Sequence, residues 1–342
     1  MALSKIPSAG FQDNVKFRNI IINGDMSIAQ RGTSATGITS TSYNTIDRFQ
    51  TNISSMGTWT QSQSTTVPSG QGFAYSLKMD CTTADASPSA SDQVVIDQRV
   101  EGQNLQYLNF GNSSAKSLTL SFWVRSNKTG TYCASLFNND QSKWFSKQYT
   151  ISSADTWEKK TLTYAGDTSN AFNNDNGTSL RCRFWLGAGS TYTSGTITST
   201  WTTESGNEGS LASGQVNLAD STSNEWYITG VQLEAGQTAS EFEFLPIGVM
   251  ESLCQRYYVS TQTSLAGYVA GANQSAGCVS IFAHPTVMRA NPTVTLTGGA
   301  GINYNGYNTR NRDEVSTSLN IKGAAAGRVF NDFDPVTFDA EI

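Results

Sequence analysis

Apolar and polar side chains alternate with a period of two along much of the chain. The clearest stretch is residues 117–125, SLTLSFWVR. Because successive side chains of a strand point to opposite faces, this stretch predicts a strand with one apolar face. The inward face consists of Leu118, Leu120, Phe122 and Val124. The outward face consists of Thr119, Ser121, Trp123 and Arg125.

Two later stretches repeat this pattern. Residues 181–187, RCRFWLG, place Cys182, Phe184 and Leu186 inward and Arg181, Arg183 and Trp185 outward. Residues 226–234, WYITGVQLE, place Tyr227, Val231 and Leu233 inward and Trp226 and Ile228 outward. Further strands are expected at 47–53, 57–63, 73–81 and 93–100, and residues 18–30 read as a strand broken by an Asn-Gly turn. Many short strands joined by Gly, Asn and Ser turns predict an all-β, jelly-roll sandwich.

Helical periodicity is nearly absent before residue 243, apart from 98–108, which is either a helical turn or a loop crossing. The exception is 245–258, LPIGVMESLCQRYY. Its apolar residues fall at helical offsets after Pro246: Ile247, Met250, Leu253, Cys254, Tyr257 and Tyr258. A helix this short needs a packing partner, so the stripe predicts a seam between domains or between subunits.

The seam divides the chain into four predicted parts. Residues 1–17 form an N-terminal arm with isolated Phe11, Val15 and Phe17. Residues 18–245 form the jelly roll and 246–259 the connecting helix. Residues 260–342 form a smaller C-terminal β domain, with strands expected in CVSIFAH (278–284), PTVTLTG (292–298) and RVFNDFDPVTF (328–338).

The composition narrows the classes of function. Charged residues make up 14% of the chain and aromatics 11%, with a net charge of −5 and no basic stripe. No nucleic-acid partner is therefore expected. No run of 18 apolar residues and no signal-peptide pattern occurs, so we expect neither membrane insertion nor secretion. Five scattered cysteines (Cys81, Cys133, Cys182, Cys254 and Cys278) have no metal-binding spacing and are expected to be small buried hydrophobes.

Catalytic and metal-binding signals are weak. The single histidine, His284, precedes a proline, and no nucleophile elbow, zinc-protease motif or phosphate-binding loop occurs. Paired carboxylates are conceivable among Asp140, Asp155, Asp167, Asp175, Glu204 and Glu208, but their spacing does not select a pair. Asp25 with Asn23 offers too few oxygens for calcium, so a turn stabilised by the Asn23 side chain is favoured. We expect no enzyme activity, no cofactor and no metal.

The outward-facing aromatic residues are the strongest candidates for binding. Trp123, Trp185 and Trp226 share the outward face with Arg125 and Arg183. If their strands belong to one sheet, they form one amphipathic surface. Three interpretations stay open for it: subunit packing, cover by loops, and a glycan platform.

Several motifs together resemble a family of bacteriophage structural proteins, mostly tail-fibre or virion proteins, that carry a jelly roll similar to carbohydrate-binding modules. The motifs occur in order between residues 18 and 258: NIIINGDMSIAQRGTS, YNTIDRF, SLTLSFWVRSNKTGTY, ISSADTWEKKTLTYAGDT, RFWLGAGSTY, YITGVQLEAGQTASEFEFLPIG and SLCQRYY. The resemblance implies a β-sandwich, no catalysis and homotrimeric assembly on the virion, and it brings no catalytic residues. Residues 260–342 are similar only loosely to fibre tips.

We therefore expect a tail-fibre or short-spike component of the virion, assembled in the host cytoplasm and engaged in attachment to the host surface. Its expected partners are copies of itself, other virion proteins through the arm, and host-surface glycan. No heptad run is present, which disfavours a long shaft. A head fibre that decorates the capsid and a fibre-borne glycan hydrolase are the alternatives.

Overall fold

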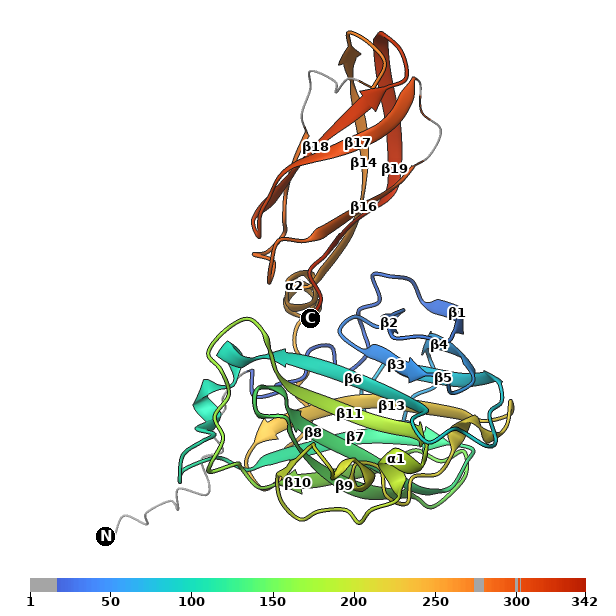
Figure 1. Cartoon of the computed structure of the whole chain (residues 1–342), viewed down its shortest axis with the longest axis vertical. Helices are drawn as coiled ribbons and strands as arrows, with labels where there is room; N and C mark the ends of the chain where they lie inside the picture. The colour runs from blue at the N-terminus through green and yellow to red at the C-terminus, as the bar shows by residue number, and fades with distance from the viewer. Residues whose placement is uncertain (1–16, 274–279, 299–300, 302) are drawn as a thin grey trace.

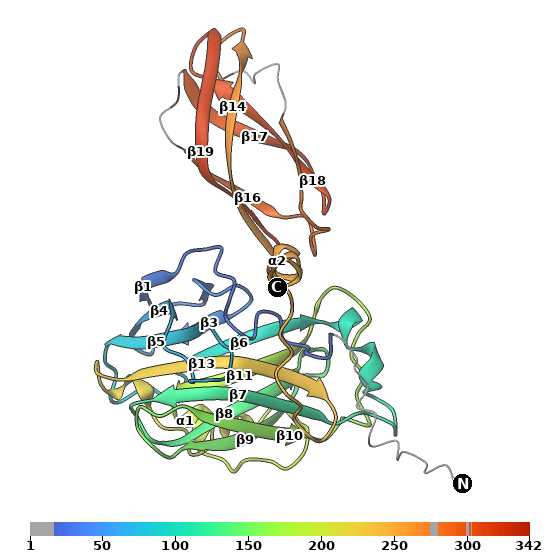
Figure 2. The ribbon, with the colours of Figure 1, turned by 180° about the vertical axis from the view of Figure 1, so that it is seen from behind.

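The protein is a jelly-roll β-sandwich followed by a short helix and a smaller β domain (Figure 1). The structure is a computed structural model that describes residues 17–273, 280–298, 301 and 303–342. The two opposite views both place the smaller domain beyond helix α2 (Ile247–Gln255), at one end of the sandwich (Figures 1 and 2). The predicted fold class is confirmed. No helix in the described ranges is long and apolar enough to cross a membrane.

One layer of the sandwich is a six-stranded antiparallel sheet. Its strand order is β1 (Ser34–Ile38), β4 (Thr58–Ser64), β5 (Ser76–Thr83), β13 (Glu225–Ala235), β7 (Leu118–Ser126) and β10 (Glu158–Tyr164). The predicted strands at 57–63 and 73–81 correspond to β4 and β5. The alternating stretch 117–125 corresponds to β7.

The second layer is a seven-stranded antiparallel sheet. Its strand order is β12 (Thr202–Thr203), β9 (Lys143–Ile151), β8 (Gly130–Asn138), β11 (Thr178–Ala188), β6 (Gln93–Glu101), β3 (Gln50–Ser54) and β2 (Ser42–Tyr43). The predicted strands at 47–53 and 93–100 correspond to β3 and β6. The stretch 98–108 continues from β6 into two single turns of 3-10 helix, Gly102–Asn104 and Gln106–Leu108.

The core lies between these two sheets. Phe122 on β7 and Phe184 on β11 meet edge to face, with ring centroids 5.1 Å apart, and so join the layers. The predicted inward residues of both strands are buried in this core: Leu118, Leu120, Phe122, Val124, Cys182, Phe184 and Leu186. Each large apolar side chain that is fully buried contributes about 1.5–3 kcal/mol relative to exposure.

The inward face of β13 was predicted only in part. Val231 and Leu233 lie in the core as expected, but Trp226 and Ile228 lie there too. Tyr227, predicted inward, lies on the outer face, where its hydroxyl donates to Glu225. The reason is a shift in the pairing of β13 with β7 between Thr229 and Gln232, at Gly230, whose φ is 62°. Such a bulge changes which alternate residues point inward.

Residues 18–30 were predicted as a broken strand, and that prediction is wrong. The segment is irregular, and side chains supply hydrogen bonds in place of a strand ladder. The Asn19 side chain donates to the carbonyl of Val231 and accepts from the backbone N–H of Leu233. The buried Asn23 side chain donates to the carbonyls of Ile28 and Asp47. The expected Asn-stabilised turn is therefore present at Asn23.

The smaller domain consists, within the described residues, of two three-stranded antiparallel sheets. One has the order β14 (Tyr258–Val269), β19 (Gly327–Asp339) and β16 (Thr293–Gly298). The other has the order β15 (Ser280–Ala283), β18 (Ser316–Gly323) and β17 (Tyr304–Arg312). The three strand-like stretches predicted here overlap β15, β16 and β19. Leu319, Val329, Phe333 and Phe338 form the centre of its separate core.

Candidate functional site

The short helix α2 explains the apolar stretch at 245–258. Met250 and Cys254 are buried and pack with Ile28 of the sandwich. Tyr257 and Tyr258 are buried as well, and Leu253 lines a small pocket against residues 17–22 and 98–107. Ile247 is 61% exposed, so it takes no part in the contact between the domains, and its place in a seam between subunits stays a prediction. It lies in the first helical turn, and its side chain is left outside the contact with Ile28.

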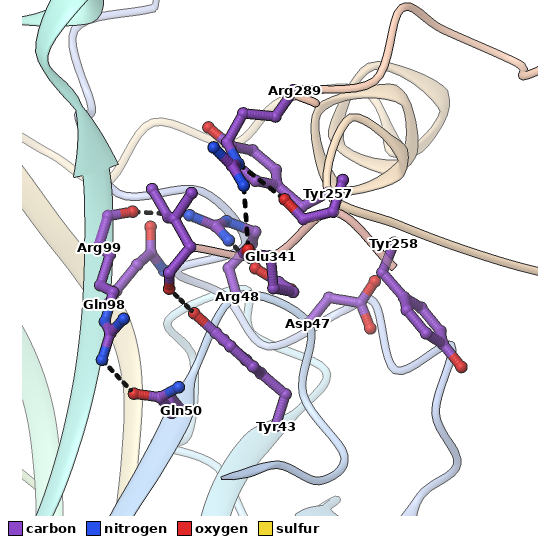
Figure 3. Close-up of polar contacts among 12 residues, drawn as sticks. Tyr43, Asp47, Arg48, Gln50, Gln98, Arg99, Tyr257, Tyr258, Arg289 and Glu341 are labelled. Carbon is purple, nitrogen blue, oxygen red and sulfur yellow. Dashed lines mark hydrogen bonds and ion pairs between the residues drawn. The ribbon is translucent and has the colours of Figure 1, made fainter. Parts of the chain in front are cut away.

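Arg48 is the centre of the contact between the two domains. It is fully buried, and its guanidinium carbon lies 3.4 Å from the centroid of the Tyr257 ring. One terminal nitrogen pairs with the carboxylate of Glu341, and the other donates to the carbonyl of Arg99 at 2.6 Å. Figure 3 shows these groups converging between β6, the 43–50 segment and the end of the chain.

A second ion pair stands beside the first. Glu101, at the end of β6, is buried and accepts hydrogen bonds from Arg256 at 2.8 and 2.7 Å and from the Tyr257 hydroxyl at 2.5 Å. Burial by itself raises the pKa of Glu101, but these donors leave it below its ordinary value. The carboxyl group is therefore held ionised.

The outer edge of this contact is formed by Arg31. Its guanidinium carbon lies 3.6 Å from the Tyr258 ring centroid, and it pairs with Asp339 at 3.3 Å and Glu341 at 3.5 Å. Burial raises the pKa of Glu341, and Arg48 and Arg31 oppose that rise. We call Arg31, Arg48, Glu101, Arg256, Tyr257 and Glu341 the interdomain joint. Its charges are paired with one another, which suits a fixed connection between domains.

A different region has the features of a binding site. A pocket of about 260 Å³ opens on the outer face of the six-stranded sheet. Its lining residues are Gln71, Phe73, Ser121, Trp123, Lys159, Gly230, Glu241, Phe242 and Phe244. We call this the aromatic pocket. Trp123 projects from β7, and Lys159 is its direct neighbour on β10.

Three phenylalanines form one wall of the aromatic pocket. The centroid of Phe73 lies 5.1 Å from that of Phe242 and 5.2 Å from that of Phe244. The centroids of Phe242 and Phe244 are 4.8 Å apart, and Phe244 stays 50% exposed. Phe73 sits directly over Gly230, because a Cβ built there would lie 2.5 Å from its Cζ. The β13 bulge thus provides the space for this ring.

The wall is held by hydrogen bonds to β13. The buried Gln232 side chain accepts from the backbone N–H of Glu243 at 2.8 Å and donates to Glu234 at 2.9 Å. Glu234 in turn accepts from the backbone N–H and hydroxyl of Ser240. The motif VQLEAGQTASEFEF therefore folds back on its own strand and fixes the phenylalanine rings before any ligand arrives.

The aromatic pocket combines an apolar floor with a polar rim. Trp123 is half-buried, whereas Gln71, Lys159 and Glu241 are exposed. Aromatic faces pack against the C–H groups of a sugar ring, and the rim provides hydrogen-bond donors and acceptors for its hydroxyls. The site is chemically suited to a saccharide.

The predicted surface of three tryptophans is not formed, and that part of the prediction is wrong. Trp226 lies between the sheets, because the β13 bulge reverses its face. Trp185 belongs to the other sheet and is buried with Val95, Trp144, Leu211 and Ala212. Loop cover is thus the correct interpretation for Trp185, whose indole nitrogen donates to Ser135 at 2.9 Å.

The two predicted arginines are also separated. Arg125 lies on the outer face of the six-stranded sheet and pairs with Asp155 at 2.8 Å and Glu225 at 3.1 Å. Arg183 lies on the seven-stranded sheet, where its Nε atom is 3.3 Å from Asp97. Alternation shows which face of a strand a residue occupies, but not which sheet the strand joins.

The remaining sequence candidates have local structural roles where they are described. Phe17 is 59% exposed, and its backbone N–H donates to Glu243; Phe11 and Val15 lie outside the described residues. His284 contacts the Phe338 ring and the Thr317 hydroxyl. Four cysteines are free and buried (Cys81, Cys133, Cys182 and Cys254), as predicted, and Cys278 lies outside the described residues.

The candidate carboxylates mostly stabilise turns or ion pairs. Asp140 accepts from the backbone and side chain of Asn173, Asp167 accepts from Ser169 and Asn170, and Asp175 accepts from Gly177. In the part of the chain that the structure describes, no cluster of three or more His, Cys, Asp or Glu side chains is arranged to hold a metal ion.

Sequence reasoning found Trp123 but missed the rest of the aromatic pocket. Phe242 and Phe244 stand in EFEF, an alternating pattern that does not become a strand. Phe73 and Gln71 come from a loop that lies more than 150 residues before Phe242 and Phe244 in the sequence. Gly230 inside an otherwise regular strand was the available signal, since such a glycine marks a bulge or a close approach.

Comparisons with known proteins give low similarities. No protein-family model matches the chain, and no curated protein matches its sequence. Among solved structures, the enzymatically active domain of bacteriophage CBA120 tailspike protein 4 has a TM-score of 0.34 at 13% identity, covering 64% of this chain and 21% of that chain. A putative sugar-binding protein from Bacteroides thetaiotaomicron has a TM-score of 0.35 at 13% identity, covering 64% and 99%.

A third similar structure is the CBM22-2 xylan-binding domain of Paenibacillus barcinonensis Xyn10C, with a TM-score of 0.27 at 13% identity, covering 63% of this chain and 96% of that chain. The similar structures are thus carbohydrate-binding modules together with a phage tailspike domain. At TM-scores below 0.5, these likenesses assign neither a ligand nor an activity to this chain.

Proposed function

We propose that the chain is a structural component of a bacteriophage virion, part of a tail fibre or short spike, that binds a host-surface saccharide in the aromatic pocket. The observation that carries the binding proposal is the pocket itself. It has a tryptophan floor, a wall of three phenylalanines and a rim containing Lys159 and Glu241, all set on a rigid sheet. The virion context comes from the motifs that resemble phage structural proteins.

The interdomain joint supports a structural role in the same proposal. A protein that transmits contact between a particle and a cell surface needs domains that keep a fixed relationship. Buried Arg48 and Glu101 connect the sandwich to residues 256–257 and 341 through charged groups that would be costly to separate. The joint therefore favours two domains that act as one body. The homotrimer in the proposal comes from the resemblance to phage structural proteins, not from the joint.

A glycan array tests the binding proposal, using wild-type protein, Trp123→Ala and Tyr268→Ala. Tyr268 is 74% exposed on β14 of the other domain and so serves as a matched control. Wild type and the control bind the same saccharides, and Trp123→Ala loses them. Absence of any wild-type hit, or equal binding by all three proteins, overturns the proposal.

Reconstruction of intact particles tests the virion context. Density for the chain on the tail supports the proposal. Density on the capsid replaces it with the head-fibre alternative. Shortened products after incubation with host polysaccharide would favour the hydrolase alternative. A clean monomer in gel filtration at high concentration would exclude the homotrimer.

A further inference from the structure

The outer face of the seven-stranded sheet carries an unbalanced group of arginines. Arg99 on β6 is the direct cross-strand partner of Arg181 on β11, and Asp97 is the partner of Arg183. Like charges placed directly opposite each other on a sheet are destabilising. We call Arg99, Arg181, Arg183 and Asp97, with the adjacent Phe137, the arginine face.

Charge on the arginine face is only partly compensated within the chain. Asp97 is fully buried and pairs with Arg183, with 3.3 Å between Nε and the carboxylate. The hydrogen bonds that Arg99 and Arg181 make within the described residues go to neutral groups, the side-chain oxygens of Gln50 at 2.9 Å and Asn139 at 2.7 Å. Among the residues that the structure describes, the guanidinium groups of Arg99 and Arg181 therefore have no carboxylate within ion-pair distance.

Several polar atoms on the arginine face are also unused. The Nε atoms of Arg99 and Arg181 are buried and have no hydrogen-bond partner among the described residues, whereas the Nε atom of Arg183 and the carboxylate of Asp97 face each other as an ion pair. A buried polar atom without a partner destabilises the folded state. Two such donors on cross-strand neighbours would be satisfied by an acceptor from outside the chain.

The surroundings favour a small, planar anion. The guanidinium carbons of Arg181 and Arg183 lie 5.5 and 5.9 Å from the centroid of Phe137, which holds both groups over one ring. The Arg183 side chain keeps 13% of its surface exposed, so this part of the arginine face is partly open to solvent. Burial, followed by Arg183 and Arg99, lowers the pKa of Arg181 to about 10, which an anion would reverse.

We propose that the arginine face is a second binding site, for the carboxylate of an acidic saccharide. Guanidinium groups bind carboxylates through paired, charge-assisted hydrogen bonds. This site is independent of the aromatic pocket, because it lies on the other sheet. Inorganic phosphate shares the anionic chemistry and is the competing occupant.

Isothermal titration tests the proposal with three probes: hexagalacturonate, the neutral maltohexaose and sodium phosphate. Wild type is expected to bind hexagalacturonate more weakly as NaCl is raised. Arg181→Gln and Arg183→Gln are each expected to weaken it about tenfold or more. Arg125→Gln, whose guanidinium is paired on the other sheet, is the matched control and is expected to bind as wild type.

Three results overturn the proposal. One is no binding of hexagalacturonate by wild type, and another is equal binding by the glutamine variants. The third is phosphate binding as tightly as hexagalacturonate, or maltohexaose binding that Arg181→Gln and Arg183→Gln weaken to the same degree. Thermal unfolding checks that the variants are folded. Arg181→Gln is expected to keep or raise the melting temperature at low salt, because the repulsion between Arg181 and Arg99 is removed. A large decrease contradicts the proposal. Neutral glycans of the aromatic pocket bind these variants unchanged, so the two proposals fail separately.

Discussion

The guanidinium of Arg48 lies 3.4 Å from the centroid of the Tyr257 ring, and both residues are buried. This stacking joins a segment of the sandwich to the residues that open the second domain. It also explains why two tyrosines stand side by side in residues 253–258, LCQRYY. Tyr257 and Tyr258 each receive an arginine from the sandwich, Arg48 and Arg31 respectively.

Arg48→Met is expected to lower the free energy of unfolding by about 3–5 kcal/mol, because Glu341 would stay buried with only Arg31, at 3.5 Å, as a partner. Lys128→Met, which breaks the surface pair with Asp220, is the control and is expected to cost about 1 kcal/mol or less. Denaturant titration measures both. If the two variants cost the same, the joint is not a stabilising connection.

Gly230→Ala is expected to disturb the aromatic pocket. The residue has a φ of 62°, and its new Cβ would lie 2.5 Å from Phe73. Gly37→Ala is the matched control, since its φ is 69° but nothing lies within 4 Å of its Cβ. We expect the Gly230 variant to lose about 1–3 kcal/mol more than the control and to bind saccharide less tightly. Equal stabilities would show that Phe73 moves freely.

Stability is expected to fall as the pH decreases from about 7 to 5 because of His284. Burial lowers the pKa of this imidazole in the folded state, with Asp313 opposing the shift. The unfolded chain then binds the proton more readily than the folded chain. The stability contributed by neutral His284 is therefore fully present above the unfolded pKa of about 6.5, and it is lost as the pH falls from there through the lower folded pKa. Asp47 and Glu341, whose pKa values are raised by burial, act in the opposite direction.

Denaturant titrations of wild type and His284→Gln at several pH values isolate this effect, since the chain has a single histidine. Between pH 7 and pH 5, His284→Gln is expected to lose less stability than wild type. A larger loss in the variant would contradict the assignment.

Thiol labelling is expected to be slow in the native protein. Burial raises the pKa of Cys81 to about 11 and that of Cys133 to about 12, and it raises those of Cys182 and Cys254 as well. The reactive thiolate is therefore scarce at neutral pH. Of five cysteines, at most one is expected to react before unfolding and all five afterwards. Rapid labelling of two or more native thiols would contradict the burial described.

The sequence was informative where the pattern was local. Alternation in β7 and β11 identified the inward residues, and helical spacing identified α2. It failed on Trp226, because the Gly230 bulge reverses the inward face within a single strand. It also failed to assemble the site, since Phe73 and Trp123 meet through sheet pairing rather than sequence proximity. Arg48 and Glu341 are 293 positions apart, and no local pattern links them.

Saccharide binding in the aromatic pocket is the central function proposed for this protein. Its most direct test is a structure of the protein with a fragment of host-surface polysaccharide bound. We expect sugar density against Trp123 and Phe244, with hydroxyls within hydrogen-bonding reach of Lys159 or Glu241. A saturating fragment that leaves this pocket empty, or occupies only another part of the molecule, would contradict the account.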